Sequence, residues 1–200
     1  LKEIVNFERF SAIGRIGKHI LYLRNDGLQN QSVYWIQEGP DGKPEVLIDP
    51  NGIAADGTAS VGIDGFSNSK RYMAYHISRS GSDWSTQYVM DLDTRKALPD
   101  ELKWVKFGGA AWKGDGFYYS RYDAPPPGAE LTAKNEYQKL CWHQLGTPQS
   151  AVRFTRNAFG GTCGFELNWR NFPFRNPLAH VGSPLDNLHM AGHFTVWPGT

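Results

Sequence analysis

The feature that most constrains the fold is a repeat within the chain. Residues 71–75 (RYMAY) match residues 18–22 (KHILY): each run begins with a basic residue followed by His or an aromatic, and each ends on Tyr. The same shift of 53 residues places residues 86–90 beneath residues 33–37. Because the register holds over two separate β-prone runs, the repeated unit is longer than one strand.

A third copy begins at Ala110, where Trp112 takes the place of Phe66 at a shift of 46 residues. A period of about 45–50 residues with roughly four short strands in each unit is typical of β-propeller blades. From Gly17 to Ser150 no apolar pattern keeps a helical period for three turns, whereas alternation in twos is common. We therefore predict an all-β fold, a partial β-propeller of about two to three four-stranded antiparallel blades.

Turn signals separate the expected strands of the first unit. The β-prone runs Lys18–Leu23, Ser32–Gln37 and Glu45–Asp49 are divided by residues 25–27 (NDG) and 40–43 (PDGK). Asn, Asp, Pro and Gly adopt the backbone angles of tight turns at low cost. The pattern predicts a meander of antiparallel strands.

The charge balance argues against nucleic acid as a partner. Lys and Arg number 21 against 20 Asp and Glu, a net charge of +1, which is far from the dense positive field that a phosphate backbone requires. No run approaches the ~18 apolar residues of a membrane-spanning helix, so no membrane partner is expected. The cysteines Cys141 and Cys163 do not make a disulfide framework and are expected to be structural thiols in a reducing compartment.

Short landmarks follow one another between about Phe7 and Ser150. They are residues 25–31 (NDGLQNQ), 47–51 (LIDPN), 81–84 (GSDW), 105–107 (VKF), 119–122 (YSRY) and 145–150 (LGTPQS). In this order and spacing they resemble the propeller of the prolyl oligopeptidase family. The resemblance implies cytosolic serine peptidases that cut short peptides after proline. In these enzymes a seven-bladed propeller caps an α/β-hydrolase domain and excludes folded proteins.

The residues and the resemblance together divide the chain into three parts. Residues 1–15 would lead into the fold, residues 16–150 would form blades 1 and 2 and part of blade 3, and residues 151–200 would be an irregular tail. The implied partners are short proline-containing peptides and the hydrolase domain of the parent chain, with no cofactor. A cytoplasmic location is expected. Because the chain begins at Leu1 rather than Met, an export signal could precede it, so a periplasmic or secreted location stays open.

The catalytic Ser, Asp and His of the family belong to its hydrolase domain, so no catalytic residue is expected here. A nucleophile elbow requires small residues around the nucleophile, usually as G-x-S-x-G, and this pentapeptide does not occur. Residues 65–69 (GFSNS) begin like one but end on Ser, and we interpret Ser67 as a turn residue. Residues 160–164 (GGTCG) are the other Gly-rich candidate, but no helix with a Cys–His pair can be identified around Cys163, so we do not expect Cys163 to be a nucleophile.

Two positions are candidates for contact with a substrate. Phe107 matches an aromatic that, in the family, lines the subsite for the peptide on the N-terminal side of the proline. Asp83 matches an acidic residue on the surface that faces the hydrolase domain, where it could bind a basic group or the amino end of a peptide. The alternatives are that Phe107 is a core residue and that Asp83 caps its own turn. Gly62 stands where several relatives carry a larger polar residue, which leaves that part of the pocket open to question.

The composition changes abruptly after Ser150. The final residues contain no Lys, and the repeat cannot be placed on them. His189 and His193 stand four apart, but Gly192 lies between them and no suitably spaced carboxylate completes a zinc site, so no metal is expected. We interpret residues 151–200 as a segment foreign to the family, such as a shifted reading frame.

The functional prediction is the propeller fragment of a prolyl-oligopeptidase-like serine peptidase, which gates access to a triad located elsewhere. One alternative is a non-catalytic β-rich module that binds peptides or other proteins through its aromatic residues. The other is a non-functional gene remnant.

Overall fold

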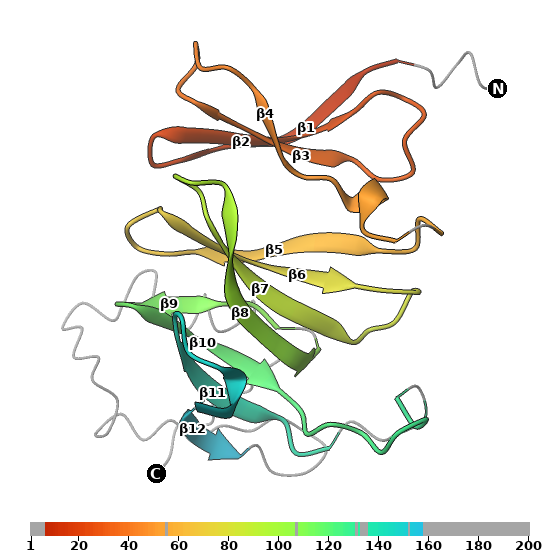
Figure 1. Ribbon diagram of the computed structural model, residues 1–200, viewed down its shortest axis with the longest axis vertical. Helices are drawn as coiled ribbons and strands as arrows, with labels where there is room; N and C mark the ends of the chain where they lie inside the picture. Colours follow the sequence, from red (N-terminus) through yellow and green to blue (C-terminus); the bar gives the residue numbers. More distant parts are fainter. Residues whose placement is uncertain are drawn as a thin grey trace, which may run out of the picture.

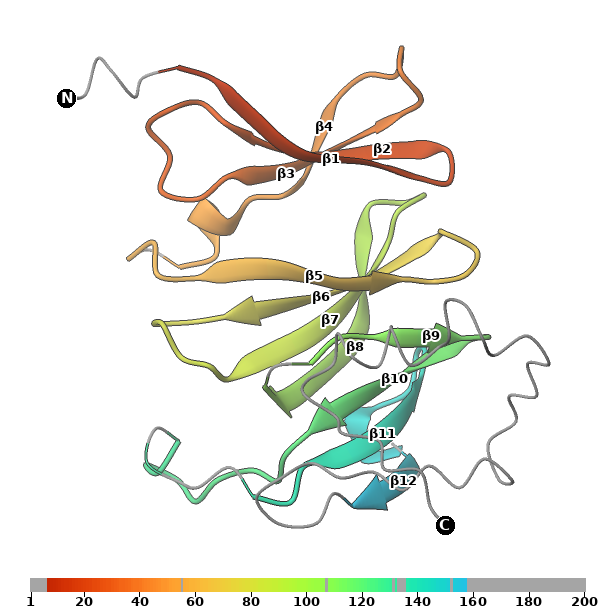
Figure 2. The same cartoon turned by 180° about the vertical axis from the view of Figure 1, so that it is seen from behind.

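The computed structural model describes residues 7–54, 56–106, 108–130, 132, 136–151 and 153–157. Three four-stranded antiparallel sheets follow one another along the long axis, and the view from behind shows the same order (Figure 1, Figure 2). In each sheet the strands pair in chain order. The prediction of an all-β, partial β-propeller fold is therefore confirmed.

We name the three sheets blades 1, 2 and 3. Blade 1 contains β1 (Arg9–Ile16), β2 (His19–Asn25), β3 (Val33–Glu38) and β4 (Glu45–Ile48). Blade 2 contains β5 (Ser60–Phe66), β6 (Tyr72–Ser78), β7 (Ser85–Asp91) and β8 (Lys96–Val105). Blade 3 contains β9 (Ala111–Lys113), β10 (Gly116–Arg121), β11 (Lys139–Gln144) and β12 (Arg153–Asn157). Two short 3₁₀ turns, η1 (Pro50–Gly52) and η2 (Gln149–Ala151), complete the regular structure of the described residues.

The sequence repeat corresponds to equivalent strands. β6 starts at Tyr72, which lies 53 residues after the start of β2 at His19. Phe66 ends β5 and Trp112 lies in β9, so both belong to the first strand of their blade. The repeat therefore relates whole blades, as predicted.

The sheets extend beyond residues 16–150 at both ends. β1 begins at Arg9, within the residues expected only to lead into the fold, and pairs with β2. Most of its side chains are exposed, so no alternation of buried and exposed residues marks it as a strand. β12 pairs with β11 beyond Ser150 and completes a four-stranded blade 3. The predictions for residues 158–200, including Cys163, His189 and His193, lie outside the described residues.

The hydrophobic core lies between the blades. One cluster joins blade 1 to blade 2 and consists of Leu21, Ile36, Leu47, Ile48, Met73, Tyr75, Met90 and Leu92. A second joins blade 2 to blade 3 and consists of Val89, Leu102, Val105, Phe117, Tyr119 and Cys141. Removing an aliphatic side chain from water stabilises a fold by about 1.5–3 kcal/mol. Blade 2 thus packs one apolar face against blade 1 and the other against blade 3.

Cys141 belongs to this core. Its side chain is fully buried, and burial raises the pKa of the thiol to about 11. A buried thiol of high pKa is a poor nucleophile. The prediction that Cys141 is structural is confirmed.

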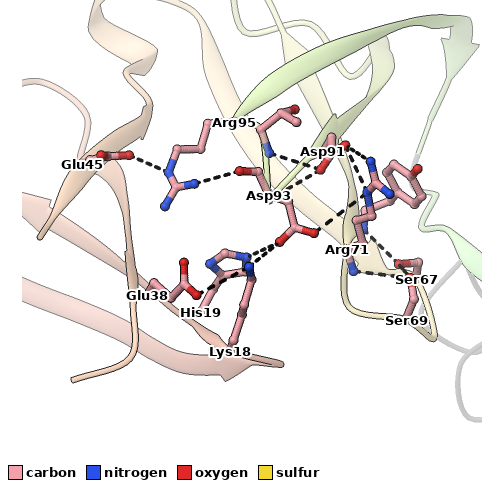
Figure 3. A network of polar contacts seen from close by, with 12 residues as sticks. Lys18, His19, Glu38, Glu45, Ser67, Ser69, Arg71, Asp91, Asp93 and Arg95 are labelled. Carbon is pink, nitrogen blue, oxygen red and sulfur yellow. Dashed lines mark hydrogen bonds and ion pairs between the residues drawn. The ribbon is translucent and has the colours of Figure 1, made fainter. Parts of the chain in front are cut away.

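A network of ion pairs also joins blade 1 to blade 2 (Figure 3). Asp93, in the turn after β7, places Oδ1 3.2 Å from the Nζ of Lys18 and 3.1 Å from the Nε2 of His19. These contacts lower the pKa of Asp93, with the His19 hydrogen bond as the largest cause. Arg95 Nε lies 2.6 Å from Glu45 Oε2, so a second pair crosses the same interface. The network fixes the turn between β7 and β8 against blade 1.

The turn between β5 and β6 lies beside this network. The Ser67 N–H donates to the Tyr72 carbonyl at 2.8 Å, and the Tyr72 N–H donates to Ser67 Oγ at 3.0 Å. Lys70 adopts a left-handed φ of 61°, and its N–H donates to the Ser67 carbonyl at 2.9 Å. The interpretation of Ser67 as a turn residue is confirmed.

Candidate functional site

A polar hollow of ≈ 330 Å³ lies at the end of blade 2 that carries the β6–β7 loop. This is the opposite end of the strands from the ion-pair network, and the loop is on the right in Figure 1. Besides two glycines, the side chains that line the hollow are those of His76, Asp83, Ser60, Ser78, Ser82 and Ser85. Asp83, a residue predicted from the sequence, is therefore part of its wall.

Asp83 is exposed on the β6–β7 loop. The turn of this loop is closed by the Ser82 N–H, which donates to the Arg79 carbonyl at 3.0 Å, and Ser82 Oγ accepts from the Trp84 N–H at 3.1 Å. Ser82, rather than Asp83, thus supplies the cap. Among the residues that the structure describes, none donates a hydrogen bond to the Asp83 carboxylate.

Trp84 anchors the loop from behind. Its indole makes edge contacts with Trp104 and Tyr122 at ring-centre distances of 5.6 and 5.8 Å. Its Nε1–H donates to the Glu130 carbonyl at 2.6 Å, and the Lys106 ammonium lies 4.3 Å from the ring centre. A half-buried indole that packs on two aromatic rings and has a satisfied N–H is a rigid support. Asp83 therefore projects from a fixed point of the loop.

Phe107, the second predicted site residue, lies outside the described residues. Its neighbour Gly108 lines the hollow. A Cβ on Gly108 would lie 3.2 Å from the Ser120 hydroxyl and 3.2 Å from a Val105 methyl group. The main chain after Phe107 thus packs closely against blades 2 and 3. The structure brings this segment to the same hollow as Asp83.

His76 is a site residue that the sequence reasoning missed. Its Nδ1 lies 2.6 Å from Oδ1 of Asp64, and the other carboxylate oxygen of Asp64 accepts from Gln87 Nε2 at 2.7 Å. The Asp64 side chain is only 3% exposed, whereas that of His76 is 31% exposed. The hydrogen bond to Asp64 raises the pKa of His76 above its ordinary value, against the opposing effect of burial. Three adjacent strands thereby hold the imidazole in one orientation.

A β-bulge produces this arrangement. The register of β5 against β6 shifts between Ile63 and Gly65, which leaves Asp64 as the extra residue. A bulge redirects the side chain at which it occurs. Gly65 follows with a φ of 153°, and a Cβ there would lie 2.7 Å from the Ala110 carbonyl oxygen. The bulge thus turns the Asp64 carboxylate toward His76 while β5 packs against the start of blade 3.

Gly62 makes room for the imidazole. It is paired directly with His76 across the two strands. A Cβ on Gly62 would lie 2.4 Å from His76 Cε1 and 2.7 Å from Nε2, closer than side chains normally approach. The larger polar residue expected from the family at position 62 is thus absent, and the His76 ring occupies the space over this glycine.

The lining suits a small polar ligand. It offers the Asp83 carboxylate, one edge of the His76 imidazole and four hydroxyl groups. Within the described ranges, no three His, Cys, Asp or Glu side chains come together as metal ligands. The same ranges contain no helix of the length and apolarity needed to cross a bilayer. The donors and acceptors match the main-chain and terminal groups of a short peptide.

The sequence model described as the N-terminal β-propeller domain of prolyl oligopeptidase matches residues 1–157. The chain belongs to the prolyl oligopeptidase family. A curated relative, a prolyl endopeptidase of Elizabethkingia meningoseptica, is 42% identical over 151 residues, which are 75% of this chain and 21% of the relative. Residues 1–157 of this chain thus match the propeller domain of the family, and the aligned part spans about a fifth of the length of this relative.

Solved structures of the family agree with this placement. Prolyl oligopeptidase B from Galerina marginata, bound to a 25mer macrocyclization substrate, matches with a TM-score of 0.68 and 30% identity, over 78% of this chain and 25% of that one. A structure from an analysis of two prolyl endopeptidases matches with a TM-score of 0.62 and 37% identity, over 76% of this chain and 21% of that one. The predicted family is therefore confirmed.

Proposed function

We propose that this chain is the propeller part of a cytoplasmic serine peptidase that cleaves short peptides after proline. The catalytic Ser, His and Asp would belong to an α/β-hydrolase domain elsewhere in the parent protein. There the Ser hydroxyl would attack the carbonyl of the proline while His accepts its proton, and N–H donors would stabilise the oxyanion. The propeller would limit access to short peptides.

The observation that carries the proposal is the polar hollow lined by Asp83 and by Gly108, the residue after Phe107. Membership of the family supports a hydrolase domain beside this propeller in the parent protein, and the hollow combines Asp83 with the main chain that follows Phe107. Phe107 would form a flat apolar wall for the residues that precede the proline. Asp83 would bind a basic group or the amino end of the peptide. Neither role requires chemistry from this chain.

The proposal is tested with a chromogenic prolyl peptide, benzyloxycarbonyl-Gly-Pro-p-nitroanilide. We expect the parent protein to hydrolyse it and the 200-residue chain alone to release no p-nitroaniline. Turnover by the purified chain would refute a catalytic site located elsewhere.

In the parent protein, we expect Phe107→Ala to raise KM with little change in kcat, because it removes binding surface rather than a reacting group. Asp41 is an exposed carboxylate in the turn between β3 and β4 of blade 1, so Asp41→Asn is a control for loss of a surface charge. A Phe107→Ala enzyme that keeps the KM of this control would contradict the subsite.

A non-catalytic peptide-binding module is the second candidate function. The hollow favours it as well, because its lining can hold a peptide without the hydrolase domain. If the chain binds proline-containing peptides and the parent protein does not hydrolyse them, the results would favour this candidate.

A further inference from the structure

Two side chains in the wall of the hollow have complementary hydrogen-bonding roles. Asp83 presents a carboxylate from the loop, and His76 presents its imidazole from the neighbouring strand β6. Among the described residues, only those of blade 2 and Gly108 line the wall. A ligand that fills this space would contact an acceptor and a donor of blade 2 at the same time.

The donor is fixed in direction. Because His76 Nδ1 is bonded to Asp64, this nitrogen carries the proton that the carboxylate accepts. His76 lines the hollow, its remaining nitrogen, Nε2, lies over Gly62, and no described residue forms a hydrogen bond with that nitrogen. The Asp64 contact favours the imidazolium, in which Nε2 also carries a proton. Nε2–H can then donate to an oxygen of a ligand.

The net charge of the wall indicates which ligand group lies opposite the one that His76 contacts. Asp64 and protonated His76 neutralise one another, so the Asp83 carboxylate leaves the wall with a net negative charge. A negative wall favours a cation and disfavours a carboxylate. A free amino terminus places an α-ammonium group and a carbonyl oxygen within one residue, which matches an acceptor and a donor on the same small hollow.

We propose that the hollow binds the free amino-terminal residue of a short peptide, with Asp83 accepting from its α-ammonium group and His76 Nε2–H donating to its carbonyl oxygen. His76 is then a specificity-determining residue, and Gly62 is the position that allows it to reach the ligand. The inference rests on the proposed function, because it defines where the N-terminal end of the peptide lies. Peptides with a blocked amino terminus would lose the contact with Asp83.

The probes are the tripeptide amide Ala-Ala-Pro-NH₂ and its N-acetylated form. Each is titrated at pH 6 into the 200-residue chain, and binding is followed by the NMR shifts of the His76 ring nitrogens and of the backbone amides. We expect the free peptide to bind about tenfold more tightly than the acetylated one, the effect of one charge-assisted hydrogen bond. Asp83→Asn should abolish this preference, whereas Asp41→Asn should leave it intact.

His76→Ala should weaken binding of the free peptide about tenfold. His76→Gln keeps an N–H donor and should restore part of that loss, which a purely structural role would not predict. Equal binding of both peptides, with no movement of the His76 nitrogen shifts, would overturn the inference and leave the proposed function standing. Failure of the chain to bind either peptide would also overturn the inference, whereas the proposed function is decided by hydrolysis in the parent protein.

Discussion

The substitution Gly62→Ala should reverse the sign of its effect on stability when His76 is removed. The alanine Cβ would lie 2.4 Å from His76 Cε1, whereas ordinary contacts lie between 3.4 and 4 Å. The ring must therefore move by about 1 Å, which stretches its 2.6 Å bond to Asp64 beyond hydrogen-bonding distance. The Asp64 carboxylate is only 3% exposed, so water cannot readily replace the lost partner.

A hydrogen bond to a charged group contributes about 1.5–3 kcal/mol. Replacing Gly by Ala in an extended strand returns about 0.4–1 kcal/mol by restricting the unfolded chain. We expect Gly62→Ala to destabilise the protein by about 1–2 kcal/mol. In a His76→Ala background only the second effect remains, so the same substitution should stabilise by about 0.4–1 kcal/mol.

The assay is urea unfolding followed by tryptophan fluorescence for the four proteins of the double-mutant cycle. The raised pKa of His76 means that its contribution is complete below the unfolded pKa of 6.5 and is lost as pH rises through the folded pKa. The cost of Gly62→Ala should therefore be larger at pH 6 than at pH 9. Gly14→Ala is the matched control, because Gly14 also lies in the first strand of a blade but has no atom within 4 Å of a Cβ. Equal costs in both backgrounds would refute the reasoning.

Three further predictions concern the rest of the fold. The Arg71 hydrogen bond lowers the pKa of Asp91, so its stabilising effect is present above pH 3.8 and lost as pH falls through the folded pKa. Asp91→Asn should therefore destabilise the chain at pH 7. The difference in unfolding free energy between this variant and the unsubstituted chain should shrink as the pH is lowered, and a difference that stays constant with pH would contradict this. In a Cys163→Ser variant, Cys141 should react with Ellman's reagent at pH 8 only as fast as the protein unfolds, because its thiol is buried with a pKa of about 11. The isolated chain should self-associate through blade 1, and Ile13→Lys, at a β1 side chain that is 70% exposed, should reduce the association measured by analytical ultracentrifugation; a monodisperse unsubstituted chain would argue against an incomplete ring.

Features that depend on short-range sequence could be predicted. The repeat located equivalent strands because each blade uses the same alternation and similar turns, and Ser67 could be assigned because a hydroxyl that closes a turn acts within a few residues. Cys141 was predicted to be buried from its residue type alone, and the structure places it in the core between blades. Asp83 was predicted as a site residue from its match to a motif of the family, and not from any physical argument about its surroundings.

The His76 contacts could not be predicted, because they depend on the register of two strands. A plain hairpin closed at Phe66 would pair His76 with Ile63 instead of Gly62. The bulge at Asp64 shifts the pairing by one residue and brings the imidazole over the glycine. No local sequence pattern identifies Asp64 as the extra residue of a bulge. The one available signal was that a glycine, Gly62, could pair with a bulky residue across the hairpin. β1 escaped prediction for a different reason, since a mostly exposed strand shows no alternation.

The shared core between blades 1 and 2 has a consequence for synthesis on the ribosome. The ribosome synthesises the blade 1 part of this cluster, Leu21, Ile36 and Ile48, early in translation. It adds their blade 2 partners Met90 and Leu92 much later. At about 5–20 residues per second, several seconds separate the two events. During that interval the nascent first sheet carries an uncovered apolar face, which is a surface that chaperones bind and that other nascent chains can join. The arrival of Leu92 closes that interval, and Asp93 follows it directly to engage Lys18 and His19.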